Sequence, residues 1–135
     1  MTPPRYMLDT NIVSDLLRNP MGKVQKKIRK IGVDAICMSV ITAAEIRFGS
    51  VKRKSPRLTG LVEDMLGAFK VIAFNVPADS DYAAIRNDLE LSGKPIGPND
   101  LLIAAHARAL GMILVTANEK EFDRVRGLKI ENWLA

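Results

Sequence analysis

Acidic and amide side chains follow short apolar segments at four places in this chain of 135 residues. They are Asp9, Glu45, Asp100 and Asn118. In a parallel α/β sheet the carboxyl ends of the strands meet at one edge, so side chains that follow the strands gather in one crevice. The spacing therefore predicts a cluster of oxygen atoms built from segments that lie far apart in the sequence.

Carboxylates held close together repel one another unless a cation lies between them. Asp9 and Asp100 are the predicted direct ligands, with Glu45 as a further one and water at other positions. Oxygen ligands of this kind suit Mg²⁺ or Mn²⁺. A zinc site rich in thiols or imidazoles is excluded, because Cys37 is the only cysteine and His106 the only histidine.

The chemistry expected at such a site is phosphodiester hydrolysis. One metal ion or a pair would serve, and the metal together with Glu45 would activate a water for in-line attack. The chain has a formal net charge of +5 and a pI of about 9.6. A basic domain with a hard-metal site favours nucleic acid as the substrate.

Helix capping is the competing interpretation of each polar position. Side-chain oxygens at helix N-termini accept bonds from otherwise unpaired backbone N–H groups, and each cap contributes about 1 kcal/mol. The capping candidates are Asp9 or Asn11, Asn99 or Asp100, and the capping-box patterns Thr42–Glu45 and Asn118–Glu121.

The periodicity of apolar residues predicts strands that alternate with helices. Strands are expected at 6–8, 35–41, 71–74, 112–115 and 129–131. Helices are expected at 12–18, 24–31, 42–48, 58–69, 78–91, 99–110 and 119–125, with a basic loop at 52–57. This order predicts one α/β domain over residues 1–135, a mostly parallel central sheet flanked by helices on both faces.

Several protein classes are not expected from this sequence. No apolar run reaches the roughly 18 residues needed to span a bilayer, and no signal-peptide pattern opens the chain. A lone cysteine allows no intramolecular disulfide. We therefore expect a cytoplasmic protein that does not enter membranes.

Four motifs in order, together spanning nearly the whole chain, resemble the PIN-domain ribonucleases, in particular the VapC toxins of bacterial toxin–antitoxin modules. The motifs are Met7–Asn11, Ser39–Gly49, Gly93–Ala107 and Val115–Phe122. The resemblance implies a PIN fold and an endonuclease that depends on Mg²⁺ or Mn²⁺ and acts on RNA.

Matched to the family's motifs residue by residue, Asp9, Glu45 and Asp100 occupy the three core acidic positions. The chain departs from many relatives at the fourth position, where Asn118 replaces an aspartate and carries no charge. Glu121 is the candidate for the missing carboxylate. Whether Asn118 or Glu121 serves there, and whether a second metal binds, stays open.

Neighbouring residues receive weaker predictions. Thr10, Asn11 and Thr116 are expected to orient the carboxylates, with capping as an almost equal alternative. His106 is six residues after Asp100 and therefore on a different face of its helix, so a structural role is expected.

The resemblance also implies partners. They are an RNA substrate, with tRNA as the expected class, a VapB-type antitoxin, a second copy of the chain in a homodimer, and operator DNA reached only through the antitoxin complex. Two rival functions remain open. One is a nuclease of RNA processing or DNA flaps, and the other is a catalytically inactive PIN module that binds RNA or protein.

Overall fold

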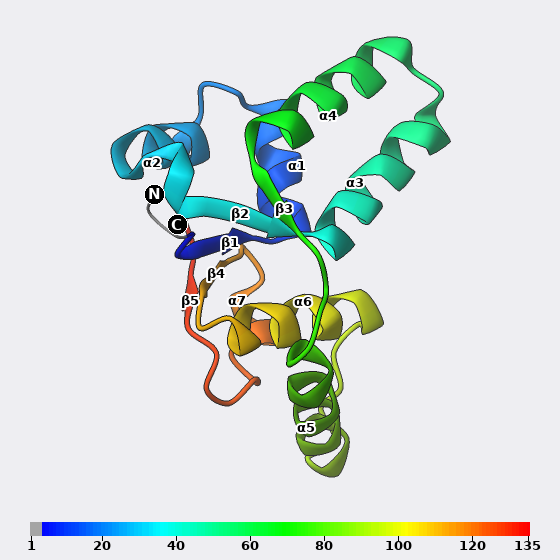
Figure 1. The fold of residues 1–135 in the computed structure, drawn as a ribbon, viewed down its shortest axis with the longest axis vertical. Coiled ribbons are helices and arrows are strands. Elements are labelled where there is room, and N and C mark those ends of the chain that lie inside the picture. Colours follow the sequence, from blue (N-terminus) through cyan, green and yellow to red (C-terminus); the bar gives the residue numbers. More distant parts are fainter. Residues whose placement is uncertain (1–3) are drawn as a thin grey trace.

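Five parallel strands form the centre of the computed structural model, which describes residues 4–135 (Figure 1). The strands lie in the order β3-β2-β1-β4-β5. Their bounds are β1 Tyr6–Leu8, β2 Ile36–Ser39, β3 Lys70–Ile72, β4 Ile113–Val115 and β5 Ile130–Glu131. All four strand pairs are parallel, as the alternation of strands and helices predicted.

The strand order creates a switch point beside β1. The chain runs outward from β1 through β2 to β3, then returns to place β4 on the other side of β1. The backbone N–H of Asp9 donates to the carbonyl of Val115 (3.0 Å), which ties the ends of β1 and β4 together. In open α/β sheets, sites form at the carboxyl end of such a switch point.

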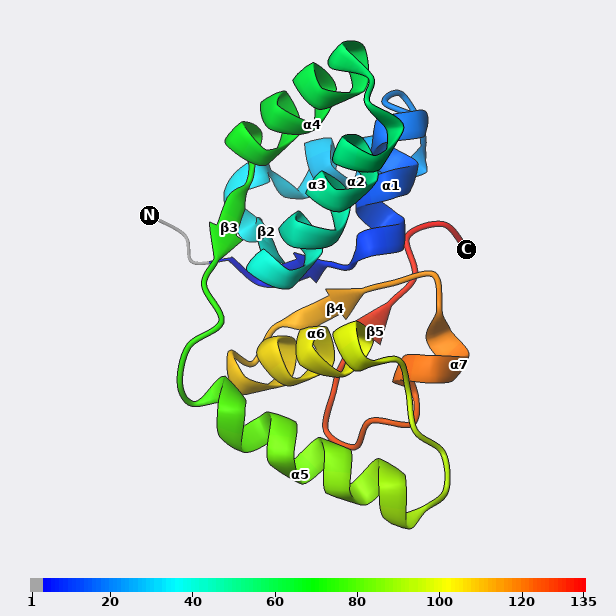
Figure 2. The same ribbon diagram turned by 90° about the vertical axis from the view of Figure 1, so that its right-hand side faces the viewer.

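Helices cover both faces of this sheet (Figure 2). The helices α1 to α4 lie on one face and α5 to α7 on the other. Their bounds are α1 Thr10–Arg18, α2 Lys23–Ile31, α3 Val40–Arg53, α4 Pro56–Ala68, α5 Ala78–Leu91, α6 Pro98–Ala109 and α7 Glu119–Phe122, with a short 3₁₀ helix at Val33–Ala35.

Alternation along the strands divides the buried core between the two faces. Leu8 and Met38 pack with α1 to α4, whereas Met7 and Cys37 pack with α5 to α7. Neighbouring strand residues point to opposite sides of a sheet, and both sides are covered here. The prediction of an apolar sheet flanked on both faces is therefore confirmed, and Cys37 is a buried core residue.

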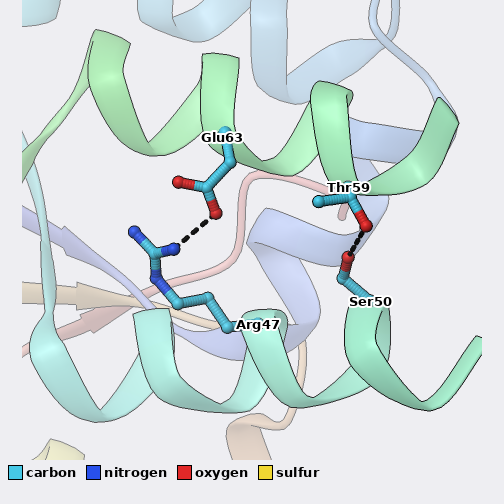
Figure 3. Close-up of polar contacts among 4 residues, drawn as sticks. All are labelled: Arg47, Ser50, Thr59 and Glu63. Carbon is cyan, nitrogen blue, oxygen red and sulfur yellow. Dashed lines mark hydrogen bonds and ion pairs between the residues drawn. The ribbon is translucent and has the colours of Figure 1, made fainter. Parts of the chain in front are cut away.

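Helices α3 and α4 form a hairpin held by polar contacts (Figure 3). The hydroxyls of Ser50 and Thr59 lie 2.9 Å apart, and Arg47 pairs with Glu63 nearer the sheet. The predicted basic loop at 52–57 is shorter in the structure and consists of Lys54 and Ser55, because α3 continues to Arg53 and α4 begins at Pro56.

The start of α3 also differs from the prediction. The strand β2 ends at Ser39, whose Oγ accepts from the backbone N–H of Ile41 (3.0 Å) and so caps α3. The predicted strand end at 41 and helix start at 42 are therefore wrong by two residues each, and the helix continues past its predicted end at 48, through Gly49, to Arg53. Elsewhere the predicted elements are present, with ends shifted by up to three residues, the most at α7, which ends at Phe122 and not at the predicted 125.

Within residues 4–135, no helix is both long and apolar enough to cross a membrane.

Candidate functional site

Asp9 lies between β1 and α1 with its side chain buried. The residue is 2% exposed, and one carboxylate oxygen accepts from the backbone N–H of Ile12 (3.2 Å). Burial raises the pKa of Asp9 to about 6, although hydrogen bonds with Thr116, Ile12 and Asn11 favour the charged form. The capping prediction for Asp9 is confirmed, and the charge of the same carboxylate also acts on Asp100.

Asp100 lies in the first turn of α6 and interacts electrostatically with the other acidic groups. Burial, a hydrogen bond with Glu121, and the negative charges of Glu121, Asp9 and Glu45 raise the pKa of Asp100 to about 7. The helix cap is Gly97, which has no side chain to bond, so capping by Asn99 or Asp100 is wrong. Asp100 therefore interacts with every other carboxylate predicted for the site.

Glu45 reaches the site from the second turn of α3. Its Oε1 accepts from the hydroxyl of Thr10, and its Oε2 accepts from the side-chain amide of Asn99 (3.2 Å). It does not close a capping box with Thr42, because the helix begins earlier, at Val40. Two side chains from α1 and α6 thus orient the Glu45 carboxylate.

The fourth position is shared by Asn118 and Glu121. The amide of Asn118 donates to Oε2 of Glu121, and the backbone N–H of Gly97 donates to Oε1 (3.1 Å). Asn118 stands at the start of α7 without a side-chain capping bond, so the capping alternative is wrong. Glu121 supplies the carboxylate that lies beside Asp100, and Asn118 orients it.

The loop between β4 and α7 is fastened to the start of α1. Oδ1 of Asn11 accepts from the backbone N–H of Ala117 (3.2 Å). The hydroxyl oxygen of Thr116 accepts from the backbone N–H of Asn118 (2.9 Å), and Thr116 is buried against Asp9. These contacts connect the segments that carry Asp9 and Glu121.

His106 takes no part in this cluster. Its ring is 1% exposed, and Nδ1 lies 2.8 Å from Oγ of Ser39. The ring of Phe74 meets it edge to face at 5.3 Å between centroids. Burial lowers the pKa of His106, which keeps the ring neutral at neutral pH. The predicted structural role is in agreement with these contacts.

The donor set fits a hard divalent cation in its chemistry. All the side chains at the crevice offer oxygen, from four carboxylates and supporting hydroxyl or amide groups. Over residues 4–135, no three Asp, Glu, His or Cys side chains already converge on one point. An ion held by Asp9, Asp100 and Glu45 would relieve the repulsion that helps to raise the pKa of Asp100.

Comparison with known proteins identifies the family. Residues 6–128 match the family model of the PIN domain. The chain is 39% identical to Ribonuclease VapC2 of Haemophilus influenzae over 132 residues, which is 96% of this chain and 98% of that protein. The chain belongs to the PIN-domain family, in its VapC branch. It is also 35% identical to the tRNA(fMet)-specific endonuclease VapC of Shigella flexneri over 130 residues, 96% of this chain and 98% of that protein.

Solved PIN-domain structures have the same architecture. The structure of VapBC2 from Rickettsia felis bound to a DNA fragment from its promoter has a TM-score of 0.89 and 34% identity over 95% of this chain and 98% of that one. DNA-bound VapBC from Salmonella typhimurium has a TM-score of 0.89 and 32% identity, over 96% and 98% of the two chains. The predicted fold and family are therefore confirmed.

Sequence reasoning missed the role of Asn99 at this PIN-domain site. The sequence pattern indicates only a helix cap at Asn99, but the amide of Asn99 donates to Glu45, 54 residues away. The signal was its position directly before Asp100, at the start of a helix that enters the crevice.

Proposed function

We propose that this PIN-domain protein is an endoribonuclease toxin dependent on Mg²⁺ or Mn²⁺, which cleaves RNA to block translation and is neutralised by a cognate antitoxin. One observation carries this proposal. Besides burial, Glu121, Asp9 and Glu45 raise the pKa of Asp100, so carboxylates from four separate segments lie close enough to interact at the end of the sheet. We propose that the whole of residues 1–135 forms this PIN domain.

In the proposed mechanism Asp9 and Asp100 would hold the ion, and Glu45 would also hold it or would accept the proton of the attacking water. A bound Mg²⁺ would stabilise charge on the phosphoryl oxygens and lower the pKa of that water. Thr10 and Asn99 hold the Glu45 carboxylate in place. Glu121, oriented by Asn118, supplies the fourth carboxylate beside Asp100.

We further propose tRNA as the substrate class and a VapB-type antitoxin as the partner. The support comes from relatives: one is named a tRNA(fMet)-specific endonuclease, and two solved VapBC assemblies are bound to DNA. By analogy, this chain would form a homodimer and reach operator DNA only within the antitoxin complex.

A catalytically inactive PIN module that binds RNA or protein is the second candidate. The observation in its favour is the neutral Asn118 at a position where a charged residue would strengthen metal binding. The two candidate functions can be distinguished by removing the charge of Asp9, because only the enzyme needs that charge.

Induced expression of the wild type and of Asp9→Asn in a bacterium tests the proposal. Growth and total RNA are followed together, with Asp64→Asn as the control because Asp64 is exposed on α4. If the protein is the proposed enzyme, growth arrest and a discrete RNA cut are expected with the wild type and Asp64→Asn only. Identical behaviour of all three proteins, with intact RNA, would favour the binding module.

A further inference from the structure

A groove beside the acidic crevice is not explained by the proposed metal chemistry. It lies along α3 between Ile41 and Phe48, on both sides of Glu45 along the helix. The residues that line it are Thr10, Ile41, Ala44, Glu45, Phe48 and Asn99. Three of these (Thr10, Glu45 and Asn99) also form the hydrogen bonds of the candidate site, so the groove and the site are continuous.

The groove face of α3 is set by helical spacing. Ile41, Ala44, Glu45 and Phe48 stand at i, i+3, i+4 and i+7 and therefore share one face of the helix. Ile46 is buried and packs in the core instead. At 1.5 Å per residue, Phe48 lies about 4.5 Å further along the helix than Glu45.

Phe48 stands out among the exposed apolar side chains. It is 66% exposed, and among the large apolar side chains exposed on residues 4–135 it carries the only aromatic ring. A ring that gains nothing from the core is available for a flat ligand. Lys52 is also exposed, four residues further along the same face, so a cation follows the ring.

We propose that Phe48 is the platform on which a nucleobase of the substrate stacks, next to the phosphate held at the acidic crevice. This inference rests on the proposed nuclease function and extends it to a base-binding subsite. The order of groups along α3 is carboxylate, aromatic ring, ammonium. A single-stranded nucleic acid presents a metal-bridged phosphate, a base and a further phosphate in the same order.

Charge favours a nucleic acid over an apolar protein surface as the occupant. Lys52 is exposed one turn beyond Phe48 on the same face of α3, whereas Arg47 is paired with Glu63 on α4. An apolar docking face would be depleted of charge at its centre. An exposed ring with a cation one turn away instead resembles the stacking platforms of single-strand binding sites.

The test is cleavage of a short single-stranded RNA by Phe48→Ala, Phe48→Tyr and the wild type. Val51→Ala is the matched control, because Val51 is 72% exposed on the same helix but outside the groove. Loss of one base–aromatic stack is expected to lower kcat/KM roughly 5- to 100-fold for Phe48→Ala. Phe48→Tyr and Val51→Ala are expected to stay within about twofold, since the first keeps an aromatic face.

Abasic substrates separate stacking from a merely structural effect. In a series of RNAs that each lack one base but keep every phosphate, one abasic position should abolish the difference between the wild type and Phe48→Ala. A loss of kcat/KM that is the same on all substrates, or a change of oligomeric state in Phe48→Ala, would overturn the subsite and assign Phe48 to packing or to a protein interface.

A binding measurement keeps the subsite distinguishable from the nuclease activity. Tryptophan fluorescence of Phe48→Trp and of Val51→Trp is measured while the RNA is added in the presence of Ca²⁺. The wild type serves as the blank, because its own Trp133 is buried. Quenching at position 48 alone supports the subsite, even if no RNA is cut and the nuclease proposal fails. No quenching at position 48, in a protein that does cut RNA, rejects the subsite alone.

Discussion

The ring of His106 lies 2.8 Å from the hydroxyl of Ser39, through Nδ1 and Oγ, although the two residues are 67 positions apart. Ser39 caps α3, which carries Glu45, and His106 stands on α6, which carries Asp100. This buried contact therefore helps to fix the position of α3, with Glu45, relative to α6, with Asp100.

Breaking this contact should cost both stability and activity. We expect His106→Leu, which keeps bulk but not the hydrogen bond, to lower the free energy of unfolding by about 1–3 kcal/mol. The rate of RNA cleavage should fall with it, since Asp100 and Glu45 would lose their fixed relation. Ser39→Ala should cost about 1 kcal/mol through the lost cap. Urea denaturation of both variants and of the double mutant measures the coupling, and strictly additive losses would show that the two side chains do not act together.

Without metal, the free energy of unfolding should fall as pH rises. An aspartate ordinarily has a pKa of 3.8, and in the folded protein the pKa is raised to about 6 for Asp9 and to about 7 for Asp100. The folded state therefore binds protons that the unfolded state has released, so the stabilising contribution is complete below about pH 4 and is lost as pH rises through 6 to 7. For the buried Asp9 this contribution is on the order of 2–3 kcal/mol.

Asp9→Asn isolates that effect, because asparagine caps a helix about as well as aspartate. Unfolding by urea is measured in EDTA between pH 4.5 and 8. The difference in stability between the variant and the wild type should grow in favour of the variant as pH rises. A difference that does not change with pH would contradict the raised pKa of Asp9.

Divalent metal should reverse this loss. At neutral pH, Mg²⁺ or Mn²⁺ is expected to raise the melting temperature of the wild type, by an amount equivalent to about 2.7 kcal/mol at one hundred times the dissociation constant. Asp9→Asn and Asp100→Asn should respond much less, and Asp64→Asn should respond like the wild type. Equal responses in all four proteins would remove Asp9 and Asp100 as ligands.

Substitution of Asn118 should change the response of the protein to metal without loss of the fold. Asn118→Asp replaces the amide that donates to Glu121 with a second carboxylate. We expect a lower melting temperature without metal, because like charges then face each other, and a larger stabilisation by Mg²⁺ than in the wild type. Thermal unfolding with and without Mg²⁺ checks this. An unchanged response to metal would place Asn118 outside the reach of the ion.

The sequence predicted the sheet and its acidic crevice because both depend on local patterns. The apolar runs that identify β1 and β4 are followed directly by Asp9 and Thr116. Parallel strands must bring their carboxyl ends to one edge of the sheet. The start of α3 was missed because the Thr42–Glu45 pattern competes with Ser39, and only the packed structure selects Ser39.

The contacts between distant segments could not be predicted in this way. The bonds from Asn99 to Glu45 and between His106 and Ser39 join residues 54 and 67 positions apart. Their formation depends on how α3 and α6 pack against the sheet, which no local spacing specifies. The continuation of α3 through Gly49 likewise depends on its hairpin with α4.

The most direct test of the central claim is RNA cleavage by purified protein. Wild type, Asp100→Asn and Asp64→Asn are incubated with total RNA in Mg²⁺ or in EDTA, and the 5′ and 3′ ends of the products are mapped. We predict discrete cuts by the wild type and Asp64→Asn in Mg²⁺ only, and a loss of several orders of magnitude in rate for Asp100→Asn. Equal cleavage by Asp100→Asn, or cleavage that persists in EDTA, would contradict a catalytic metal held by these carboxylates.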